Sequence, residues 1–579
     1  MSLVVLELEA MKLSPVASFK DADIGTLSWV NNERLVFKLA NFNLQRREDW
    51  VRPGTYAVNR DGGALRRLPD ANILLSDVGH QDSDEIFVAS IEGHGKSVND
   101  FWRLNKLNTA TGREQEIEVP TYSNTWLFDQ AGQLRVAVKT EGSRHTLIYK
   151  DVGSTQWNKL NEFDLLSSNI VEPIAIGPDN TLYVRSNLGK DKTAIYRYDL
   201  NNHSVLPDPL IYSNDYDIGS GLLFDQKKLL GVRYEIDAEV TQWFDLSMRA
   251  TQKMVDELLP ATTNRISFGA RSETPFFIVD AFSDRQPHVF FLYNSATHKL
   301  SKLGAAHPDI DPKQMSPMDM VHYQARDGMT IPAYITMPIG QATKNLPMVV
   351  LIHGGPWVRG GHWEWNPEVQ FLASRGYVVL QPEFRGSTGF GSRHFKAGWK
   401  QWGLAMQDDI TDGTNWAIAQ GIADPKRICI AGASYGGYAT LMGLIKNPDM
   451  YRCGIEWVGV TDINLMYSVR WSDFSDVAKN FSMPIMIGDR TKDAEQLNAT
   501  SPLRLATQIR QPLLMAYGSA DERVPIIHGE EFYEAIKKVN KDVEWIEYPD
   551  EGHGWYFQND RFDFWTKVER FLDRNVGLH

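Results

Sequence analysis

The residues around Ser434 have the types and spacing of a reactive serine held in a sharp turn. Glycine occurs two positions before it and two positions after it, in the run Gly432-Ala-Ser-Tyr-Gly436. The run follows an apolar, strand-like segment at 427–431 and leads into a segment with helical spacing of apolar residues. Small flanking residues permit a strand–turn–helix connection that lifts a serine hydroxyl above a sheet. We therefore predict that Ser434 is a nucleophile.

A serine hydroxyl needs a nearby base to become nucleophilic, and His553 is the predicted base. Apart from the last residue, His579, only His528 and His553 follow Ser434 in the chain. His553 lies between two glycines just after a strand-like segment. Loops at the carboxyl ends of strands are where α/β sheets build their sites. His528 begins an amphipathic helical segment, where we expect an exposed, structural role.

The base needs a carboxylate to orient it, and Asp521 is the predicted acid. It follows the strand-like segment 513–517, which gives the chain order serine, acid, histidine that is typical of α/β-hydrolases. Its short side chain suits a hydrogen bond with an imidazole, whereas Glu522 is expected to be a solvated neighbour. Three earlier aspartates are expected in a lid-like or pocket segment: Asp462, Asp473 and Asp476.

Two backbone N–H groups are candidates for stabilising the oxyanion that forms when a serine attacks a carbonyl group. One belongs to Tyr435, directly after the nucleophile. The other lies in the glycine pair after the strand-like segment 347–352, and here we favour Gly355. A turn that simply ends a strand is the alternative for this glycine pair. No metal or cofactor is expected in chemistry of this kind.

The carboxyl-terminal half has the pattern of a fold that could position these residues. After about residue 312, apolar strand-like runs alternate with segments of helical spacing. Mostly parallel sheets that are covered by helices on both faces have this pattern. We predict an α/β-hydrolase catalytic domain over residues 312–579.

Residues 1–311 instead predict a β-propeller domain. Short strand-like runs end in an acidic residue or an asparagine, and these units recur 43 to 52 residues apart. A four-stranded propeller blade has about 40–50 residues. Seven units predict seven blades, and an irregular all-β region is the alternative. The recurring positions are Glu7, Asn59, Asn108, Asp151, Asp199, Asp245 and Asn294.

Composition argues against several function classes. The 579 residues include 60 Lys and Arg against 73 Asp and Glu, a net charge of −13, which disfavours a nucleic-acid or anionic-membrane partner. No apolar run reaches the ~18–20 residues that span a bilayer. The two cysteines, Cys429 and Cys453, lie in apolar segments and are expected to be buried free thiols. The first residues lack a signal-peptide pattern and resemble a strand already under way, so we expect a truncated first blade and predict no compartment.

Five motifs together resemble the prolyl oligopeptidase family of serine peptidases, most closely its acylaminoacyl-peptidase and dipeptidyl-peptidase-like branch. The resemblance implies a propeller before an α/β-hydrolase domain, and hydrolysis of short peptides through an acyl-enzyme. It also implies that the Gly355 N–H belongs to the oxyanion hole. The motifs are His353-Gly-Gly-Pro356, Arg385-Gly-Ser-Thr-Gly-Phe-Gly391, Gly432-Ala-Ser-Tyr-Gly-Gly-Tyr438, Ser519-Ala-Asp-Glu-Arg-Val-Pro525 and Gly552-His-Gly554.

The same resemblance implies residues that bind substrate. Arg523 would bind the carbonyl oxygen of the residue before the cleavage-site residue, and a surface ion pair is its alternative role. Val460, Ile463 and Met466 would line the pocket for the cleavage-site side chain. Because these side chains are aliphatic rather than aromatic, they argue against strict cleavage after proline.

Two other functions are left open by the sequence. An esterase or lipase-like hydrolase could use the same serine, acid and base on an ester. The propeller could also be a binding module attached to a degenerate hydrolase scaffold, although the complete set of catalytic residue types argues against this. The sequence does not decide between endo- and exo-cleavage, nor whether copies of the chain form a homo-oligomer.

Overall fold

The protein is described by a computed structural model that divides the chain into two compact units. The first unit comprises Met1–Tyr212, Leu222–Leu230 and Ser475–Val477, and the second comprises Ser213–Gly221, Gly231–Phe474 and Ala478–His579. The structure describes residues 2–20, 22–40, 54–75, 82–92, 101–164, 166–167, 169–219, 221–269, 274–340, 344–469 and 472–577.

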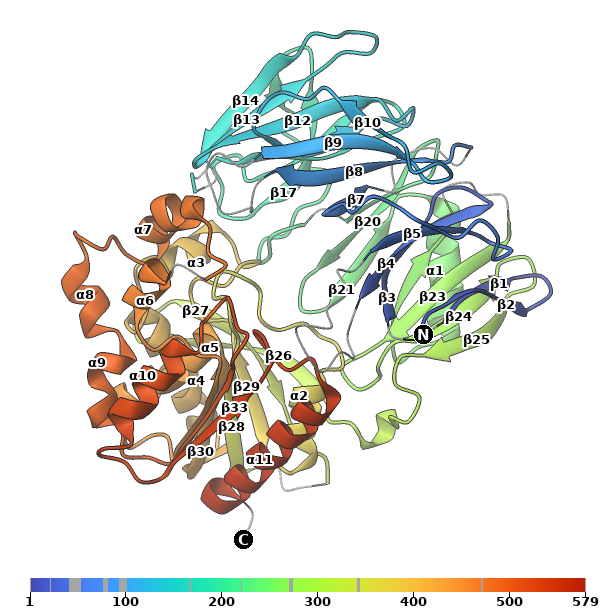
Figure 1. Ribbon diagram of the computed structural model, residues 1–579. Helices are drawn as coiled ribbons and strands as arrows, with labels where there is room; N and C mark the ends of the chain where they lie inside the picture. The colour runs from blue at the N-terminus through green and yellow to red at the C-terminus, as the bar shows by residue number, and fades with distance from the viewer. Residues whose placement is uncertain are drawn as a thin grey trace. The chain divides into compact units, whose positions relative to one another are not determined.

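Antiparallel sheets of short strands follow one another along the first half of the chain and form a β-propeller region (Figure 1). Five sheets have four strands each, β3–β6, β7–β10, β11–β14, β15–β18 and β22–β25, and the sheet β19–β21 has three. A two-stranded sheet, β1–β2, precedes them. Six blades are therefore seen in the described part of the chain, and the predicted number of seven is not confirmed.

The strands of this region have the following bounds: β1 (Ser2–Glu7), β2 (Lys12–Ser18), β3 (Asp23–Trp29), β4 (Arg34–Ala40), β5 (Thr55–Asn59), β6 (Arg66–Arg67), β7 (Ile73–Leu75), β8 (Glu85–Glu92), β9 (Phe101–Asn108), β10 (Glu114–Ile117), β11 (Ser123–Phe128), β12 (Leu134–Glu141), β13 (Arg144–Tyr149), β14 (Asn158–Asp164), β15 (Val171–Ile176), β16 (Leu182–Ser186), β17 (Ala194–Asp199), β18 (Ser204–Val205), β19 (Gly221–Phe224), β20 (Leu229–Glu235), β21 (Glu239–Trp243), β22 (Thr263–Ser267), β23 (Phe276–Phe282), β24 (Val289–Asn294) and β25 (Lys299–Ala305).

Three of the seven recurring acidic or amide residues of the sequence repeat close the turn after the third strand of a blade. In Asn108, Asp199 and Asn294, Oδ1 accepts hydrogen bonds from the backbone N–H groups two and three residues further on. Asx side chains favour such turns because they supply an acceptor in place of a backbone carbonyl. At Asp245 the same two bonds instead begin the helix α1 (Leu246–Leu258), so the sheet β19–β21 has no fourth strand.

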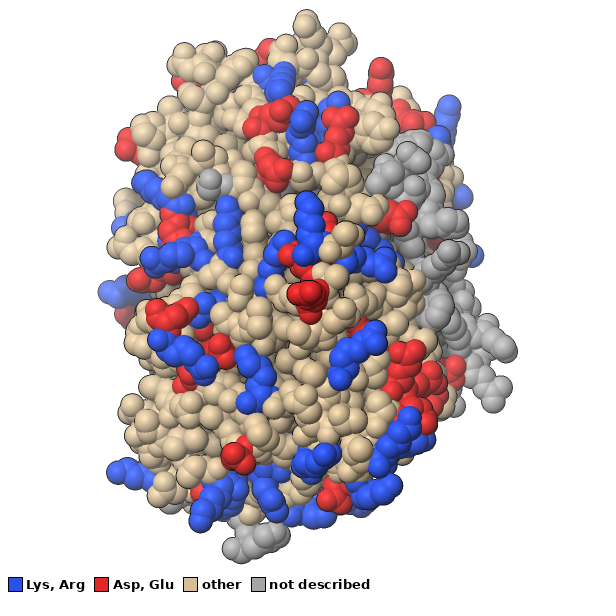
Figure 2. Space-filling model, turned by 90° about the vertical axis from the view of Figure 1, so that its left-hand side faces the viewer, with Lys and Arg blue, Asp and Glu red and all other residues tan. Residues whose placement is uncertain are grey.

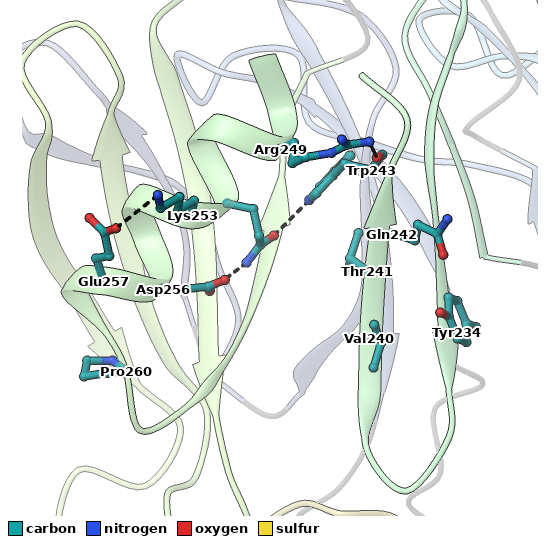
Figure 3. A pocket seen from close by; sticks show the side chains of 11 residues that line it. Tyr234, Val240, Thr241, Gln242, Trp243, Arg249, Lys253, Asp256, Glu257 and Pro260 are labelled. Atoms are coloured by element: carbon teal, nitrogen blue, oxygen red, sulfur yellow. Dashed lines mark hydrogen bonds and ion pairs between the residues drawn. The ribbon is translucent and has the colours of Figure 1, made fainter. Parts of the chain in front are cut away.

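An open groove of about 880 Å³ lies between β21 and α1 (Figure 3). The indole N–H of Trp243 donates to Gln252 at 3.0 Å, and the Gln252 amide donates to Asp256 at 2.9 Å. The first bond connects the last strand of the blade to the helix that replaces its fourth strand, and the second lies within that helix. The groove is lined by Tyr234, Val240, Thr241, Gln242, Trp243, Arg249, Gln252, Lys253, Asp256, Glu257 and Pro260, none of which is a predicted site residue.

The second half of the chain forms an eight-stranded sheet in the order β26-β27-β29-β28-β30-β31-β32-β33. The pairs from β29 to β33 are parallel, and β26 and β27 add antiparallel pairs at one edge. Ligands bind at the carboxyl ends of strands in such sheets, near the point where strand order reverses. The strands are β26 (Met318–Gln324), β27 (Thr330–Thr336), β28 (Leu346–Ile352), β29 (Val378–Pro382), β30 (Ala423–Ala433), β31 (Cys453–Trp457), β32 (Leu513–Gly518) and β33 (Val543–Tyr548).

Helices cover both faces of this sheet, as the alternating sequence pattern predicts. The core on one face includes side chains of α4, α5 and α10, and the core on the other face includes side chains of α2 and α11. Each fully buried Leu, Ile or Val side chain contributes about 1.5–3 kcal/mol of transfer free energy. The helices are α2 (Pro367–Ser374), α3 (Ser392–Ala397), α4 (Ala405–Ala419), α5 (Tyr435–Lys446), α6 (Ile463–Ser468), α7 (Met483–Met486), α8 (Ala494–Ala499), α9 (Pro502–Leu505), α10 (Ile527–Ile536) and α11 (Gln558–Val576).

The two cysteines lie in this sheet, on the adjacent strands β30 and β31. Cys429 and Cys453 are buried and free, which confirms the sequence prediction. Lys and Arg side chains are interspersed with Asp and Glu over much of the face drawn in Figure 2. Within the described ranges, no helix has the combined length and hydropathy of a membrane-spanning segment.

A buried ion pair ties the end of β29 to α4. The Arg385 guanidinium binds both oxygens of Asp409, at 2.7 and 2.8 Å, and Asp409 is fully buried. The backbone N–H of Arg385 also donates to Asp409, at 2.9 Å. A second carboxylate, Asp327, binds the same guanidinium at 2.8 Å, but its side chain is 50% exposed.

Replacing the buried carboxylate should destabilise the fold far more than replacing the exposed one. We expect Asp409→Asn to lower the free energy of unfolding by about 3–5 kcal/mol, because it leaves a guanidinium group buried with reduced compensation. The matched control Asp327→Asn should cost less than about 1 kcal/mol. Urea denaturation of both variants measures the difference, and equal losses would contradict this account.

Candidate functional site

Ser434 lies in the turn between β30 and α5 with a backbone conformation that an L-residue rarely adopts. Its φ is 59° and its ψ is −119°. A Cβ atom on Gly432 would lie 2.6 Å from the carbonyl oxygen of Ile352, and one on Gly436 only 2.1 Å from it. The two glycines thus let the turn and the start of α5 come against the end of β28. The strand–turn–helix context expected for Ser434 is present.

The structure brings Asp521 and His553 together after β32 and β33. His553 Nδ1 lies 2.8 Å from Asp521 Oδ2, and the Asp521 side chain is fully buried. The other oxygen of Asp521 accepts the backbone N–H groups of Arg523 and Val524 at 2.8 and 2.9 Å. The carboxylate is therefore held in place, and it fixes the imidazole so that Nε2 is left to exchange a proton. Glu522 is exposed, as expected.

The loop that carries His553 is anchored by a residue that the sequence analysis missed. Glu551 is fully buried, and its two oxygens accept the backbone N–H groups of Tyr556 and Phe557 at 2.9 and 2.8 Å. The Glu551 carbonyl oxygen also accepts the N–H of Ala520. A glutamate directly before the Gly552-His-Gly554 run was the only signal in the sequence.

The loop after β28 lies against Ser434. A Cβ atom on Gly354 would be 3.8 Å from the Ser434 hydroxyl oxygen, and Gly355 has a φ of +111° that favours glycine. Tyr435 is the first residue of α5, so its N–H has no partner carbonyl in a preceding turn of the same helix. Both N–H groups predicted for the oxyanion hole thus lie on segments next to the serine.

A second buried glutamate holds the far end of the same loop. Glu383 follows β29, is fully buried, and accepts the backbone N–H groups of Gly360, at 3.0 Å, and Gly361. His353, at the start of the loop, bonds the Ser387 hydroxyl at 3.0 Å through Nε2. These contacts fix the loop at both ends. No local sequence pattern predicted them.

The residues predicted to contact substrate divide into two groups. Val460, Ile463 and Met466 are buried in one hydrophobic cluster with Tyr435. Arg523 is 51% exposed and pairs with both oxygens of Asp473, at 2.6 and 2.8 Å. Asp473 thus orients an exposed guanidinium two residues after the acid.

The expectation that His528 is exposed is wrong. The side chain is 1% exposed, and its Nδ1 accepts the backbone N–H of Thr461 at 3.2 Å. The Thr461 hydroxyl donates to the His528 carbonyl oxygen at 2.7 Å. The amino-terminal end of α10, which carries His528, packs against the sheet. The first turn of the helix is therefore in the core. His528 therefore supports the segment that leads to Ile463.

The space around Gly436 leads to a first prediction for the site. Gly436→Ala should lower the free energy of unfolding by about 3 kcal/mol or more and abolish reactivity of Ser434, because the new methyl group would meet a backbone carbonyl. Gly304→Ala is the matched control, since a Cβ atom there meets nothing within 4 Å. Thermal unfolding and labelling with a fluorophosphonate probe measure both effects. Normal labelling of the Gly436 variant would contradict the predicted crowding.

Burial of His528 leads to a second prediction. Burial lowers its pKa from 6.5 to about 4, so the folded protein keeps it neutral while the unfolded chain protonates it below about pH 6.5. Its contribution to stability is therefore complete above pH 6.5 and is lost as the pH falls toward 4, by up to about 1.4 kcal/mol per pH unit. His528→Asn should remove this part of the pH dependence in urea denaturation series. His322→Asn, at an exposed histidine, should leave the dependence unchanged.

Comparisons with known proteins identify the family to which this region of the chain is similar. The model of the prolyl oligopeptidase family matches residues 363–579, which contain Ser434, Asp521 and His553. Dipeptidyl aminopeptidase BIII of Pseudoxanthomonas mexicana is 32% identical over 443 residues, which are 73% of this chain and 62% of that protein. Dipeptidyl peptidase family member 6 of Caenorhabditis elegans is 30% identical over 497 residues, 78% of this chain and 65% of that protein.

The chain thus spans less than two thirds of the length of these two relatives. Among solved structures, a puromycin hydrolase has the same fold, with a TM-score of 0.75 at 18% sequence identity. The match covers 98% of this chain and 90% of the puromycin hydrolase chain. Through the region 363–579, which carries the serine turn and the paired acid and histidine, the chain belongs to the prolyl oligopeptidase family.

Proposed function

We propose that the protein is a serine peptidase that hydrolyses short peptides through an acyl-enzyme intermediate. The observation that carries this proposal is the 2.8 Å bond between His553 and the buried Asp521, at the same end of the sheet as the Ser434 turn. A histidine oriented by a buried carboxylate is the general base that a serine nucleophile needs.

The mechanism follows from the roles of these groups. His553 Nε2 takes the proton of the Ser434 hydroxyl as its oxygen attacks the peptide carbonyl, and Asp521 stabilises the resulting imidazolium. The N–H groups of Tyr435 and Gly355 stabilise the oxyanion. His553 then gives the proton to the leaving amine. Water, activated by the same histidine, hydrolyses the acyl-enzyme and restores the serine.

Substrate selection in this proposal depends on the residues around the serine. Val460, Ile463 and Met466 form an aliphatic wall for the side chain at the cleavage site, and Arg523, oriented by Asp473, binds a peptide carbonyl. The two relatives reported above are named as a dipeptidyl aminopeptidase and a dipeptidyl peptidase family member. Release of amino-terminal dipeptides is therefore the first activity to test, with removal of blocked amino-terminal residues second.

The domain organisation supports this activity and is part of the proposal. We assign residues 1–311 to the propeller and 312–579 to the catalytic domain, because β25 ends at Ala305 and β26, the first strand of the catalytic sheet, begins at Met318. The sheet β1–β2 takes the place of a seventh blade. In support, Leu3, Val16 and Ala17 pack in one cluster with side chains of β4 and β5.

Removing the nucleophile or the acid tests the proposed function. Ser434→Ala should abolish fluorophosphonate labelling and peptide hydrolysis. Asp521→Asn should lower kcat by roughly 10⁴-fold, because an amide N–H facing Nδ1 favours the tautomer of His553 that already carries its proton on Nε2. Mass spectrometry of products from peptides with free and blocked amino termini, and from matched esters, measures the activity. The control Ser374→Ala, at an exposed serine of α2, should be unchanged.

Two outcomes would contradict the proposal. Labelling that survives Ser434→Ala would exclude this serine as the nucleophile. Rapid hydrolysis of the esters with negligible cleavage of any matched peptide would favour an esterase that uses the same three residues.

A further inference from the structure

Glu456 is a buried acidic residue beside the nucleophile turn that the proposed mechanism does not use. It lies on β31, and its backbone is in register with Gly432, the first glycine of the turn on β30. Its side chain is 0% exposed. An acidic group in the core is costly unless its environment compensates it, so its presence there requires a reason.

The carboxyl group of Glu456 lies between two segments of the site, the first turn of α5 and the chain around Gly459. Oε2 accepts the backbone N–H of Gly459 at 3.2 Å. A Cβ atom on Gly459 would lie 2.5 Å from Oε2, and one on Gly437, in the first turn of α5, would lie 3.2 Å from it. The carboxyl group therefore occupies the space that side chains at these two glycines would fill.

Gly459 itself is held from both sides. Its carbonyl oxygen accepts the hydroxyl of Tyr517, on β32, at 2.8 Å, while its N–H is bound by Glu456. The next residue, Val460, donates its N–H to the Ser434 carbonyl oxygen at 3.4 Å. The start of the segment from Gly459 to Met466 is thus bonded both to the nucleophile turn and to the side chains of Glu456 and Tyr517.

Glu456 fits this site as an uncharged acid. Burial raises its pKa to about 8, and the Tyr517 hydroxyl and the Gly459 N–H partly oppose that rise. Tyr517, on β32, is the titratable group that acts on Glu456, and Asp521 acts on Tyr517 in turn. Gly437 of α5 lies next to Oε2. Its second oxygen, Oε1, has no hydrogen-bond partner among the described residues, and a proton on Oε1 lowers the cost of burying it.

We propose that Glu456 is a positioning residue that, through its bond to the Gly459 N–H, fixes the segment from Gly459 to Met466 relative to Ser434. This inference rests on the proposed function in one respect: the segment carries Val460, Ile463 and Met466, the wall for the substrate side chain. Loss of Glu456 should therefore weaken substrate binding more than it slows the chemical step.

The test compares Glu456→Gln and Glu456→Ala in the full chain. The amide of Gln keeps an acceptor for Gly459 without a titratable proton, so kcat/KM should stay within about three-fold of the unmodified protein at pH 7. Glu456→Ala should lower kcat/KM for peptides with an apolar cleavage-site residue by about 30-fold, mainly through KM. Glu547→Ala, at an exposed glutamate of β33, is the matched control and should have no effect. Equal activities of Glu456→Ala and the unmodified protein, or equal losses in both variants, would overturn the proposal.

The pH profile provides a readout that a purely structural role would not change, and it needs only the Gln variant. As an acid with a raised pKa, Glu456 is neutral below about pH 8 and becomes a buried anion above it. Because Oε1 has no partner among the described residues, an ionised carboxylate would draw water into the space that the carboxyl group fills between Gly437 and Gly459 and displace the segment. Activity of the unmodified protein should therefore fall as the pH rises through 8, and activity of Glu456→Gln should not. The same fall in both proteins would overturn the proposal, even if Glu456→Ala does not fold.

Failure of the proposed function can be distinguished from failure of this inference. If the unmodified protein cleaves no peptide, the rate at which a fluorophosphonate probe labels Ser434 still reports the position of the turn. Labelling of Glu456→Ala at least ten-fold slower than labelling of Glu456→Gln supports the positioning role. Equal labelling rates of the two variants, with the peptides uncleaved, would overturn it.

Discussion

The site depends on how closely the first turn of α5 approaches the end of β28. Gly432 and Gly436 allow this approach, because side chains there would overlap the carbonyl oxygen of Ile352. Only with this contact can Ser434 hold its unusual backbone conformation at the edge of the sheet. The helix then presents the Tyr435 N–H where a growing negative charge can be stabilised. The geometry of the site therefore depends on the packing of α5 against the sheet, and not on the stability of either element alone.

Three buried glutamates hold the three loops that surround this turn. Glu383 accepts N–H groups of the loop after β28, Glu456 accepts one from the segment after β31, and Glu551 accepts two from the loop that carries His553. Irregular loops near a core expose backbone N–H groups that need acceptors. Carboxyl groups satisfy them and fix the loops without adding further chain. The polar parts of the site are thus positioned by side chains that take no part in the proposed chemistry.

In the propeller region, one local hydrogen-bond pattern recurs from blade to blade. In each of three blades, an Asp or Asn at the end of the third strand accepts two backbone N–H groups and closes the turn to the fourth. The same side-chain geometry at Asp245 begins α1 instead, because Leu246–Leu258 can form an amphipathic helix. One local interaction therefore leads to a strand or to a helix according to the residues that follow it.

The sequence by itself determined the features that depend on local chain geometry: the glycine-flanked turn at Ser434, the alternation of strands and helices, and the Asx turns of the propeller repeat. Turn shape and periodicity are properties of neighbouring residues, so they can be predicted without tertiary contacts. Only the tertiary structure decided that His528 is buried and that Glu383, Glu456 and Glu551 anchor loops. These outcomes depend on which distant segments pack together, because burial and hydrogen-bond partners are set across the fold rather than along the chain.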